Sequence, residues 1–216
     1  MKILRFENVN DLTCAIENEL RDLVIQHNKL RIFVPTGRTP LPLYEKLRKN
    51  SEFWGAKLDP IQIDEFVQKD RPFLDVLNRE LGRPLGLEIS AWNPHFDDNE
   101  VENYIREILS KPIHLSLLGL GLNGHVGFHE PSYPSTFIGG RVWVSDETRL
   151  RTKKAMTSEV LTFGVGAFLK SKNIFLIVTG REKEKIFKEF QNTPPDKTLP
   201  ATLLKNHPKL KVFTDL

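Results

Sequence analysis

Short apolar runs alternate with segments of helical periodicity along most of the chain. Apolar residues recur three or four positions apart over 11–27, which predicts a helix capped by Asn10 or Asp11. Residues 30–34 (LRIFV) follow as a nearly continuous apolar run, which is typical of a buried parallel strand. Pro40 then begins a second helical pattern, because proline is well tolerated in the first turn of a helix.

The same alternation continues toward the end of the chain. We expect further strands over 61–63, 113–118, 141–144, 173–178 and 211–213, and further helices over 71–81, 101–109 and 182–190. This order predicts an α/β fold, a mostly parallel sheet flanked by helices and Rossmann-like, in one domain spanning 1–216. Ligands of such folds bind beyond the carboxyl ends of the strands, where three polar segments lie: 35–40, 64–65 and 119–130.

Composition narrows the class of protein. With 216 residues and 39% hydrophobic residues, the chain can bury a continuous core. The net charge of +3 is not clustered, so we expect no nucleic-acid partner, whereas a small anionic substrate fits. Cys14 is the single cysteine, which excludes an internal disulfide and favours a reducing compartment. Glu7 and Asp11 interrupt any signal-peptide core, and no run approaches the ~18 apolar residues of a membrane span, so we expect a cytoplasmic protein without a membrane partner.

The segment 35–40 (PTGRTP) joins a predicted strand to a predicted helix. Backbone N–H groups at a helix start are unpaired and attract anions. Thr36 and Thr39 add hydroxyl donors to this helix start. Gly37 lets the backbone approach a ligand closely, and Arg38 adds a positive charge. The set suits a phosphate, and an ordinary turn capped by Thr39 is the equally weighted alternative. The Gly-Lys-Ser/Thr ending of a nucleotide P-loop is absent.

Two further segments carry charge at predicted strand ends. Asp64 and Glu65 are adjacent, so their side chains should face opposite ways, and one of them can serve as a general base in the crevice. A solvated strand end or helix cap is the alternative, and it is favoured on local evidence. Lys183 follows the strand predicted over 173–178 and can reach a phosphate across the crevice, although an exposed charge on an amphipathic helix is the simpler interpretation.

The segment 119–131 (GLGLNGHVGFHEP) matches two binding motifs that require a helix, but its glycines and prolines prevent that helix. It satisfies the dinucleotide fingerprint G-x-G-x-x-G, yet Gly127 and Pro131 prevent the long helix that should follow. His125 and His129 are four apart like a helical zinc pair, but the same residues remove the helix. We therefore expect neither a nicotinamide cofactor nor a metal.

What remains in this segment is a flexible polar loop with a histidine and a carboxylate. His125 oriented by Glu130 would be a general acid–base near neutral pH. A structural histidine bonded to backbone is the alternative for either His125 or His129 taken alone. No nucleophile elbow of the form G-x-S-x-G exists in the chain.

Five segments, in order, resemble the glucosamine-6-phosphate deaminase and 6-phosphogluconolactonase superfamily, which has a ribose-5-phosphate isomerase/CoA-transferase-like fold. Residues 35–40 are similar to the phosphate loop Pro-Thr-Gly-Gly-Thr-Pro, and 63–67 (IDEFV) are similar to Met-Asp-Glu-Tyr-Val. Residues 119–131 are similar to the signature Gly-x-Gly-x-Asn/Asp-Gly-His-Ile-Ala/Gly-Phe-Asn-Glu-Pro. Residues 161–168 (LTFGVGAF) and 200–208 (PATLLKNHP) also match deaminase segments.

Two enzyme types of that superfamily must be separated. Residues 128–131 (FHEP) and 164–166 (GVG) resemble deaminases, since lactonases continue after the histidine with a Ser-Leu-Phe-Pro type sequence. Residues 199–201 (LPA) and the short chain favour lactonases slightly. The resemblance implies a deaminase that converts glucosamine 6-phosphate to fructose 6-phosphate and ammonia without metal or cofactor. A 6-phosphogluconolactonase is the alternative enzyme, and a non-catalytic sugar-phosphate sensor is the alternative from another class.

The resemblance also implies residue roles. His125, oriented by Glu130 and Asn123, would move a proton between the ring oxygen and O1 of the sugar. Asp64 would take the proton from C2 and deliver it to C1. The expected phosphate-binding set is Thr36, Gly37, Arg38, Thr39, Lys183 and Lys154.

The chain departs from the family pattern at several positions. Arg38 replaces the second glycine of the phosphate loop, His129 replaces an asparagine, and Asn123 stands where many members have aspartate. The stretch between Glu130 and Gly164 is shorter than in typical deaminases, whose lid lies there with a phosphate-binding arginine. Candidate substitutes for that arginine are Arg151, Lys153 and Lys154. A sugar phosphate is the expected partner, and a homo-oligomer is left open.

Overall fold

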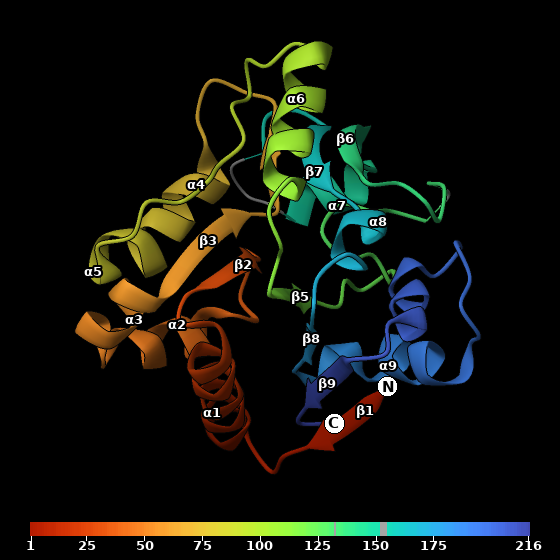
Figure 1. Cartoon of the computed structure of the whole chain (residues 1–216). Coiled ribbons are helices and arrows are strands. Elements are labelled where there is room, and N and C mark those ends of the chain that lie inside the picture. Colours follow the sequence, from red (N-terminus) through yellow and green to blue (C-terminus); the bar gives the residue numbers. More distant parts are fainter. Residues whose placement is uncertain (132, 152–154) are drawn as a thin grey trace.

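A six-stranded sheet, all of whose paired neighbours are parallel, forms the centre of the computed structural model, which describes residues 1–131, 133–151 and 155–216 (Figure 1). The strand order is β1-β9-β8-β5-β2-β3. Its strands are β1 (Lys2–Arg5), β2 (Leu30–Val34), β3 (Leu58–Gln62), β5 (Leu115–Gly119), β8 (Ile174–Val178) and β9 (Leu210–Thr214). The predicted α/β fold with a mostly parallel sheet flanked by helices is confirmed.

Helices cover both faces of this sheet, which explains why its strands read as continuous apolar runs. In β8 alternate side chains enter separate cores: Ile174 and Leu176 pack on one face, while Phe175 and Ile177 pack on the other. One core is covered by α1 (Val9–His27), α2 (Leu41–Arg48), α3 (Ser51–Lys57), α4 (Pro72–Leu77), the π-helix η1 (Asn78–Gly82) and α5 (Arg83–Leu85). The other is covered by α6 (Asp98–Leu109), α8 (Val165–Phe168), α9 (Glu184–Asn192) and the 3₁₀-helix η3 (Pro200–Asn206).

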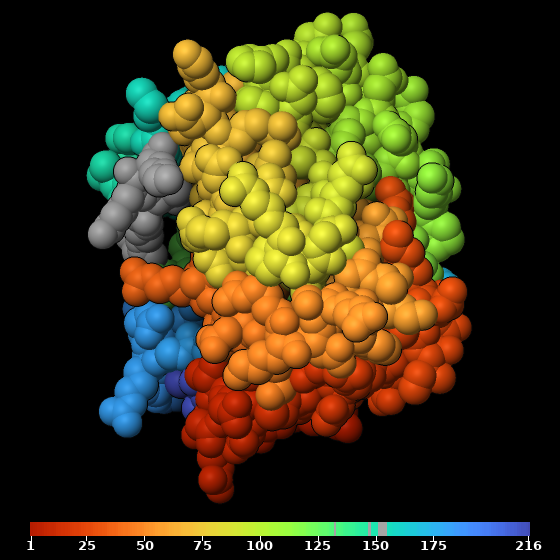
Figure 2. All heavy atoms as spheres, turned by 90° about the vertical axis from the view of Figure 1, so that its left-hand side faces the viewer, coloured from red at the N-terminus to blue at the C-terminus, as the bar shows by residue number. Residues whose placement is uncertain are grey.

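Helices α2 to α5 form much of one side of the molecule (Figure 2). In that view their orange and yellow atoms lie between the red N-terminal helix and the yellow-green atoms of α6. Among the described residues, no helix combines the length and the apolar character that a membrane crossing requires.

A second, antiparallel sheet lies beside the first, and of its strands the sequence predicted only the one over 141–144, which corresponds to β6. Its order is β4-β7-β6, from β4 (Asp64–Phe66), β7 (Glu159–Phe163) and β6 (Gly139–Trp143). The short helix α7 (Asp146–Arg151) lies in the connection between β6 and β7. The chain leaves the large sheet after Gln62 and enters the small one at Asp64, so Asp64 stands at the junction of the two sheets.

Several boundaries differ from the predicted ones because local capping decides them. The N-cap of α1 is Asn8, whose side chain accepts a hydrogen bond from the backbone N–H of Asp11, so the predicted caps Asn10 and Asp11 are wrong. Helix α6 begins before residue 101, because Asp97 and Glu100 form a reciprocal capping box. The helix predicted over 71–81 is divided into α4 and η1.

Glu65 anchors the start of α4 from within the protein. Its side chain is fully buried and accepts hydrogen bonds from the backbone N–H groups of Phe66, Phe73 and Leu74, at 3.0, 3.2 and 2.9 Å. The side-chain amide of Gln62 donates a fourth bond at 3.0 Å. Burial raises the pKa of Glu65, and these four donors oppose that rise by stabilising the carboxylate. The contact joins β4 to α4 and so fixes both elements.

We predict that Glu65→Gln lowers the free energy of unfolding by about 1–3 kcal/mol, because all four partners are donors and an amide nitrogen cannot accept from them. Urea unfolding followed by circular dichroism measures this loss. Glu184→Gln, on the exposed face of α9, is the matched control and should unfold like the wild type. Equal stability of Glu65→Gln and the control would show that the carboxylate does not anchor α4.

Candidate active site

A cavity of about 220 Å³ opens at the carboxyl ends of β2 and β5, where the fold was predicted to bind its ligand. Its lining includes seven residues singled out from the sequence: Thr36, Gly37, Arg38, Thr39, Asp64, His125 and Lys183. Asn123 and Glu130 lie behind His125 and contact it directly. The three polar loops are therefore brought together at one edge of the sheet.

One wall of the cavity is the turn between β2 and α2. Gly37 has φ of +86°, a conformation that favours glycine, and it is exposed together with Arg38. Lys183, from the 3₁₀-helix η2 (Arg181–Lys183) after β8, donates a hydrogen bond to Thr39 Oγ1 at 3.0 Å. Burial lowers the pKa of Lys183, against the opposing charges of Glu182 and Asp215. A partly buried ammonium beside hydroxyl donors suits an anion in the cavity.

Asp64 forms another part of the wall. Its side chain is 7% exposed, and burial, with a contribution from the charge of Glu65, raises its pKa to about 8. The two neighbouring carboxylates face opposite ways, Asp64 into the cavity and Glu65 toward α4. A carboxylate with this pKa would be suited to accept a proton under mildly alkaline conditions.

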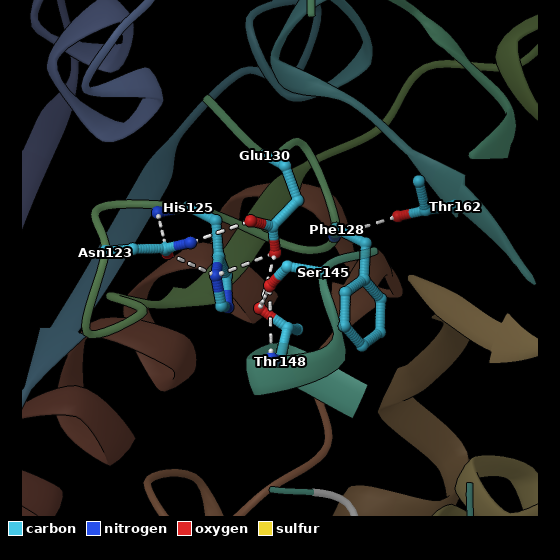
Figure 3. Close-up of polar contacts among 7 residues, drawn as sticks. All are labelled: Asn123, His125, Phe128, Glu130, Ser145, Thr148 and Thr162. Atoms are coloured by element: carbon cyan, nitrogen blue, oxygen red, sulfur yellow. Dashed lines mark hydrogen bonds and ion pairs between the residues drawn. The ribbon is translucent and has the colours of Figure 1, made fainter. Parts of the chain in front are cut away.

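His125, Asn123 and Glu130 form a hydrogen-bonded triangle (Figure 3). Asn123 Nδ2 donates to Glu130 Oε2 at 2.7 Å, which turns the amide oxygen of Asn123 toward His125 Nδ1 at 2.6 Å. Glu130 Oε1 lies 3.3 Å from the same ring nitrogen. Because both neighbours of Nδ1 are acceptors, Nδ1 carries the proton in the neutral ring, and Nε2 is the basic nitrogen.

Glu130 is held as a carboxylate. Burial acts to raise its pKa, but hydrogen bonds and charge from His125, with further bonds from Asn123 and Thr148, outweigh burial and lower the pKa below its usual value. A negative charge beside Nδ1 stabilises the imidazolium that forms when Nε2 takes a proton. The arrangement supports a proton-transferring histidine.

Steric constraints explain why glycine occurs at two positions of this loop. A Cβ on Gly121 would lie 2.5 Å from ring atoms of His125, so the imidazole occupies the space that any other residue would fill. Gly124 has φ of +84° and approaches Leu199 closely enough that a Cβ would clash at 2.1 Å. The sequence prediction that no long helix follows this loop is confirmed, because residues 122–131 form turns and an isolated bridge.

His129 contacts different residues from His125. It is fully buried, and its Nδ1 accepts a hydrogen bond from the backbone N–H of Val165 at 3.1 Å. Burial lowers its pKa, opposed by the backbone of Tyr133. His129 therefore ties the loop to the start of α8. No group of three metal-ligating side chains occurs within residues 1–131, 133–151 and 155–216.

Three contributors to the site were not predicted from the sequence. Thr148 in α7 donates a hydrogen bond to Glu130 Oε1 at 3.2 Å, and Phe73 and Phe128 line the cavity with parallel rings 5.9 Å apart. Thr148 lies in a short helix without a periodic pattern, so only its hydroxyl could have signalled it. Of the candidate lid cations, Arg151 ends α7, while Lys153 and Lys154 lie outside the described residues.

Comparisons with known proteins match nearly the whole chain. The profile of the family described as glucosamine-6-phosphate isomerases/6-phosphogluconolactonase matches residues 6–213. A glucosamine-6-phosphate deaminase of Bacillus cytotoxicus is 26% identical over 229 residues, and one of Bacillus thuringiensis is 24% identical over 234. Both alignments cover 100% of this chain and 87% of the relative.

Two solved structures share the fold. A monomeric glucosamine-6-phosphate deaminase superposes with a TM-score of 0.88 at 20% identity, covering 99% of this chain and 97% of the other. A 6-phosphogluconolactonase from Thermotoga maritima superposes with a TM-score of 0.77 at 21% identity, covering 98% and 97%. These likenesses support the arrangement of strands and helices described above.

The raised pKa of Asp64 makes stability depend on pH. The folded protein retains a proton that the unfolded chain releases near pH 4, so stability should fall by about 1.4 kcal/mol per pH unit between the two pKa values.

Asp64→Asn lacks this dependence of stability on pH. We predict that the free energy of unfolding of Asp64→Asn, relative to that of the wild type, increases steadily from pH 5 to pH 7.5 and levels off above pH 8. Urea titrations at each pH measure the difference, with exposed Asp22→Asn as control. A difference independent of pH would contradict the buried, protonated state of Asp64.

Proposed function

The chain belongs to the glucosamine-6-phosphate isomerase/6-phosphogluconolactonase family, and we propose that it converts glucosamine 6-phosphate and water to fructose 6-phosphate and ammonia. One observation carries this proposal: Asp64 and His125 line the same cavity as residues 36–39 and Lys183, and Glu130 contacts His125. A phosphorylated sugar held at one end would present its reacting carbons to two separate proton-transferring groups.

The phosphate would bind at the end of the cavity formed by Thr36, Thr39 and Lys183. Hydroxyl and backbone donors at the start of α2 suit its oxygens, and the ammonium of Lys183 neutralises its charge. Arg38 lines the same wall and adds a second cation. Binding energy from this unreactive end can orient C1 and C2 of the sugar against the catalytic groups.

Ring opening would use His125. Its Nε2 is the free basic nitrogen of the neutral ring, so it can take the proton of the O1 hydroxyl and return it to the ring oxygen as the C1–O5 bond breaks. Glu130 stabilises the charged imidazole between these two transfers. The product of this step is the open-chain aldehyde.

Isomerisation would use Asp64. The C2 proton is acidified by the C1 carbonyl, and the carboxylate of Asp64 would remove it while the C2 ammonium group of the substrate gives a proton to O1, which leaves an enol with an amino group on C2. Return of a proton to C1 produces an imine at C2, and addition of water followed by loss of ammonia leaves fructose 6-phosphate. The proton that Asp64 takes is the one it can give back, so the carboxylate ends in its starting state.

A lactone hydrolase is the second candidate, and the superposition on the Thermotoga maritima lactonase supports it. His125 would then activate a water molecule against the lactone carbonyl, and Glu130 would stabilise the imidazolium. That reaction removes no proton from carbon. Asp64 distinguishes the two reactions, because only deamination and isomerisation need a base at C2.

We predict that Asp64→Asn reduces kcat for ammonia release by about 10²-fold or more, while binding of the sugar phosphate is largely retained. In the wild type, kcat/KM should rise with pH through about 8, since the base must be ionised. An ammonia assay measures the loss of kcat and the pH dependence of kcat/KM, and exposed Asp22→Asn is the control. Hydrolysis of 6-phosphogluconolactone that survives Asp64→Asn would assign the lactonase reaction. Binding without any turnover would assign a sensor.

We predict that Lys183→Gln raises KM for the phosphorylated sugar by roughly ten- to a hundredfold and changes kcat little, because it removes a charge-assisted contact at the unreactive end. Steady-state kinetics with glucosamine 6-phosphate measure the effect. Lys188→Gln, on the exposed side of α9, is the matched control. Inorganic phosphate should inhibit the wild type more strongly than Lys183→Gln. Equal inhibition of the two proteins would exclude Lys183 from the phosphate site.

A further inference from the structure

We propose that Thr148 is a positioning residue for the His125–Glu130 pair, whose hydroxyl fixes the carboxylate oxygen that faces the imidazole. The inference rests on the proposed role of His125 as a proton-transferring group. It adds a residue from α7, in which the sequence analysis named only Arg151, as a candidate for phosphate binding. The contacts that carry it are drawn in Figure 3.

The hydroxyl of Thr148 reaches the oxygen that matters for His125. Thr148 Oγ1 lies 3.2 Å from Glu130 Oε1, and this same oxygen lies 3.3 Å from His125 Nδ1. Glu130 is held ionised and can only accept, so the single hydroxyl proton of Thr148 is donated to it. Glu130 Oε1 is therefore fixed between a threonine hydroxyl and the ring N–H of His125.

The position of the Thr148 hydroxyl is itself fixed. Ser145 Oγ donates to Thr148 Oγ1 at 3.1 Å, and it accepts from the backbone N–H of Thr148 at 3.2 Å. Ser145 thus caps the first turn of α7 and holds the threonine side chain in one rotamer. The donor relay runs from Ser145 through Thr148 to the carboxylate of Glu130 (Figure 3).

The carboxylate of Glu130 is held by hydrogen bonds at both of its oxygens, which restricts its rotation. The last torsion of a glutamate side chain has a broad energy profile, so one hydrogen bond leaves the carboxylate plane free to rotate. Asn123 holds Oε2 and Thr148 holds Oε1, and together they define the plane in which Oε1 faces Nδ1. Without Thr148, Oε1 would keep only its 3.3 Å contact with His125, and the carboxylate would be freer to rotate about its bond to Asn123.

Burial also argues that the contact is built into the fold. Thr148 is 9% exposed. Ser145, which donates a hydrogen bond to it, lies at the exposed start of the same helix. The threonine hydroxyl points inward to a residue eighteen positions earlier in the chain. The position of α7 against the loop of His125 therefore sets the geometry of the carboxylate.

The test compares hydroxyl loss with hydroxyl retention at one position. Thr148→Val keeps the branched shape and removes the donor, and Thr148→Ser keeps the donor. Thr13→Val is the matched control, because Thr13 is buried and its hydroxyl bonds the carbonyl of Asn10 in α1. Thr148→Ala removes the same hydroxyl without the added methyl of valine and replaces Thr148→Val should the latter fail to fold.

We expect Thr148→Val to lower kcat for ammonia release about tenfold with KM within threefold, since a misplaced catalytic group slows the reaction without weakening phosphate binding. Thr148→Ser should restore kcat to near the wild-type value, and Thr13→Val should not change it. Unchanged kcat in Thr148→Val, or a serine variant as slow as the valine variant, would overturn the proposal and assign Thr148 a packing role.

A second readout does not depend on the proposed reaction. The ¹⁵N spectrum of the His125 imidazole reports which ring nitrogen carries the proton. We expect the neutral Nδ1–H form in all three proteins, because Asn123 Oδ1 still accepts from Nδ1 in each of them. The Nδ1 resonance should be shifted in Thr148→Val alone, where Glu130 Oε1 is no longer fixed beside Nδ1. Identical spectra in all three proteins would overturn the positioning role. A wild type that releases no ammonia would refute the proposed function alone, and the spectra would still decide the part played by Thr148.

Discussion

The exit of the chain from the large sheet at Ile63 is the constraint on which the site depends. Its carbonyl accepts a hydrogen bond from the indole of Trp92 at 2.9 Å, and the side chain of Gln62 donates to the carbonyl of Asp64 at 2.8 Å. These bonds hold the backbone between β3 and β4 in one path. Because side chains alternate along an extended chain, that path sends Asp64 to the cavity and Glu65 to α4.

The two neighbouring acids then show how the protein balances stability against reactivity. Glu65 is fully buried, yet four donors satisfy its carboxylate, so its burial strengthens the join between β4 and α4. Asp64 is nearly as buried, and burial together with the charge of Glu65 raises its pKa to about 8. A carboxylate kept short of stabilising partners holds its proton strongly and is a better base when ionised.

The sequence predicted the strands and loops that apolar runs and glycine-rich turns determine. The strands 30–34 and 173–178 are confirmed within a residue, because short, nearly continuous apolar runs admit few alternatives in a covered sheet. The three loops of the cavity followed from the rule that strand ends of a parallel sheet meet at one edge. The strand predicted over 141–144 is β6, but its pairing in a small antiparallel sheet and the helix α7 were not predicted, since these elements are short and depend on tertiary contacts. Thr148 belongs to that group, and its contact with Glu130 joins segments that local patterns treat separately.

The position of Asp64 also bears on the choice between the two reactions of the family. In the proposed function either reaction would use a phosphate held at the loop of Thr39 and a histidine with a free Nε2, and residues suited to both lie at the cavity. Hydrolysis of a lactone would gain nothing from a second base against the sugar carbons. A buried acid with a raised pKa lowers stability near neutral pH, because the folded state resists the ionisation that the unfolded chain undergoes freely. Such a group is retained at a site when the chemistry uses it. In the proposed deamination Asp64 would abstract the proton from C2, whereas hydrolysis of a lactone removes no proton from carbon.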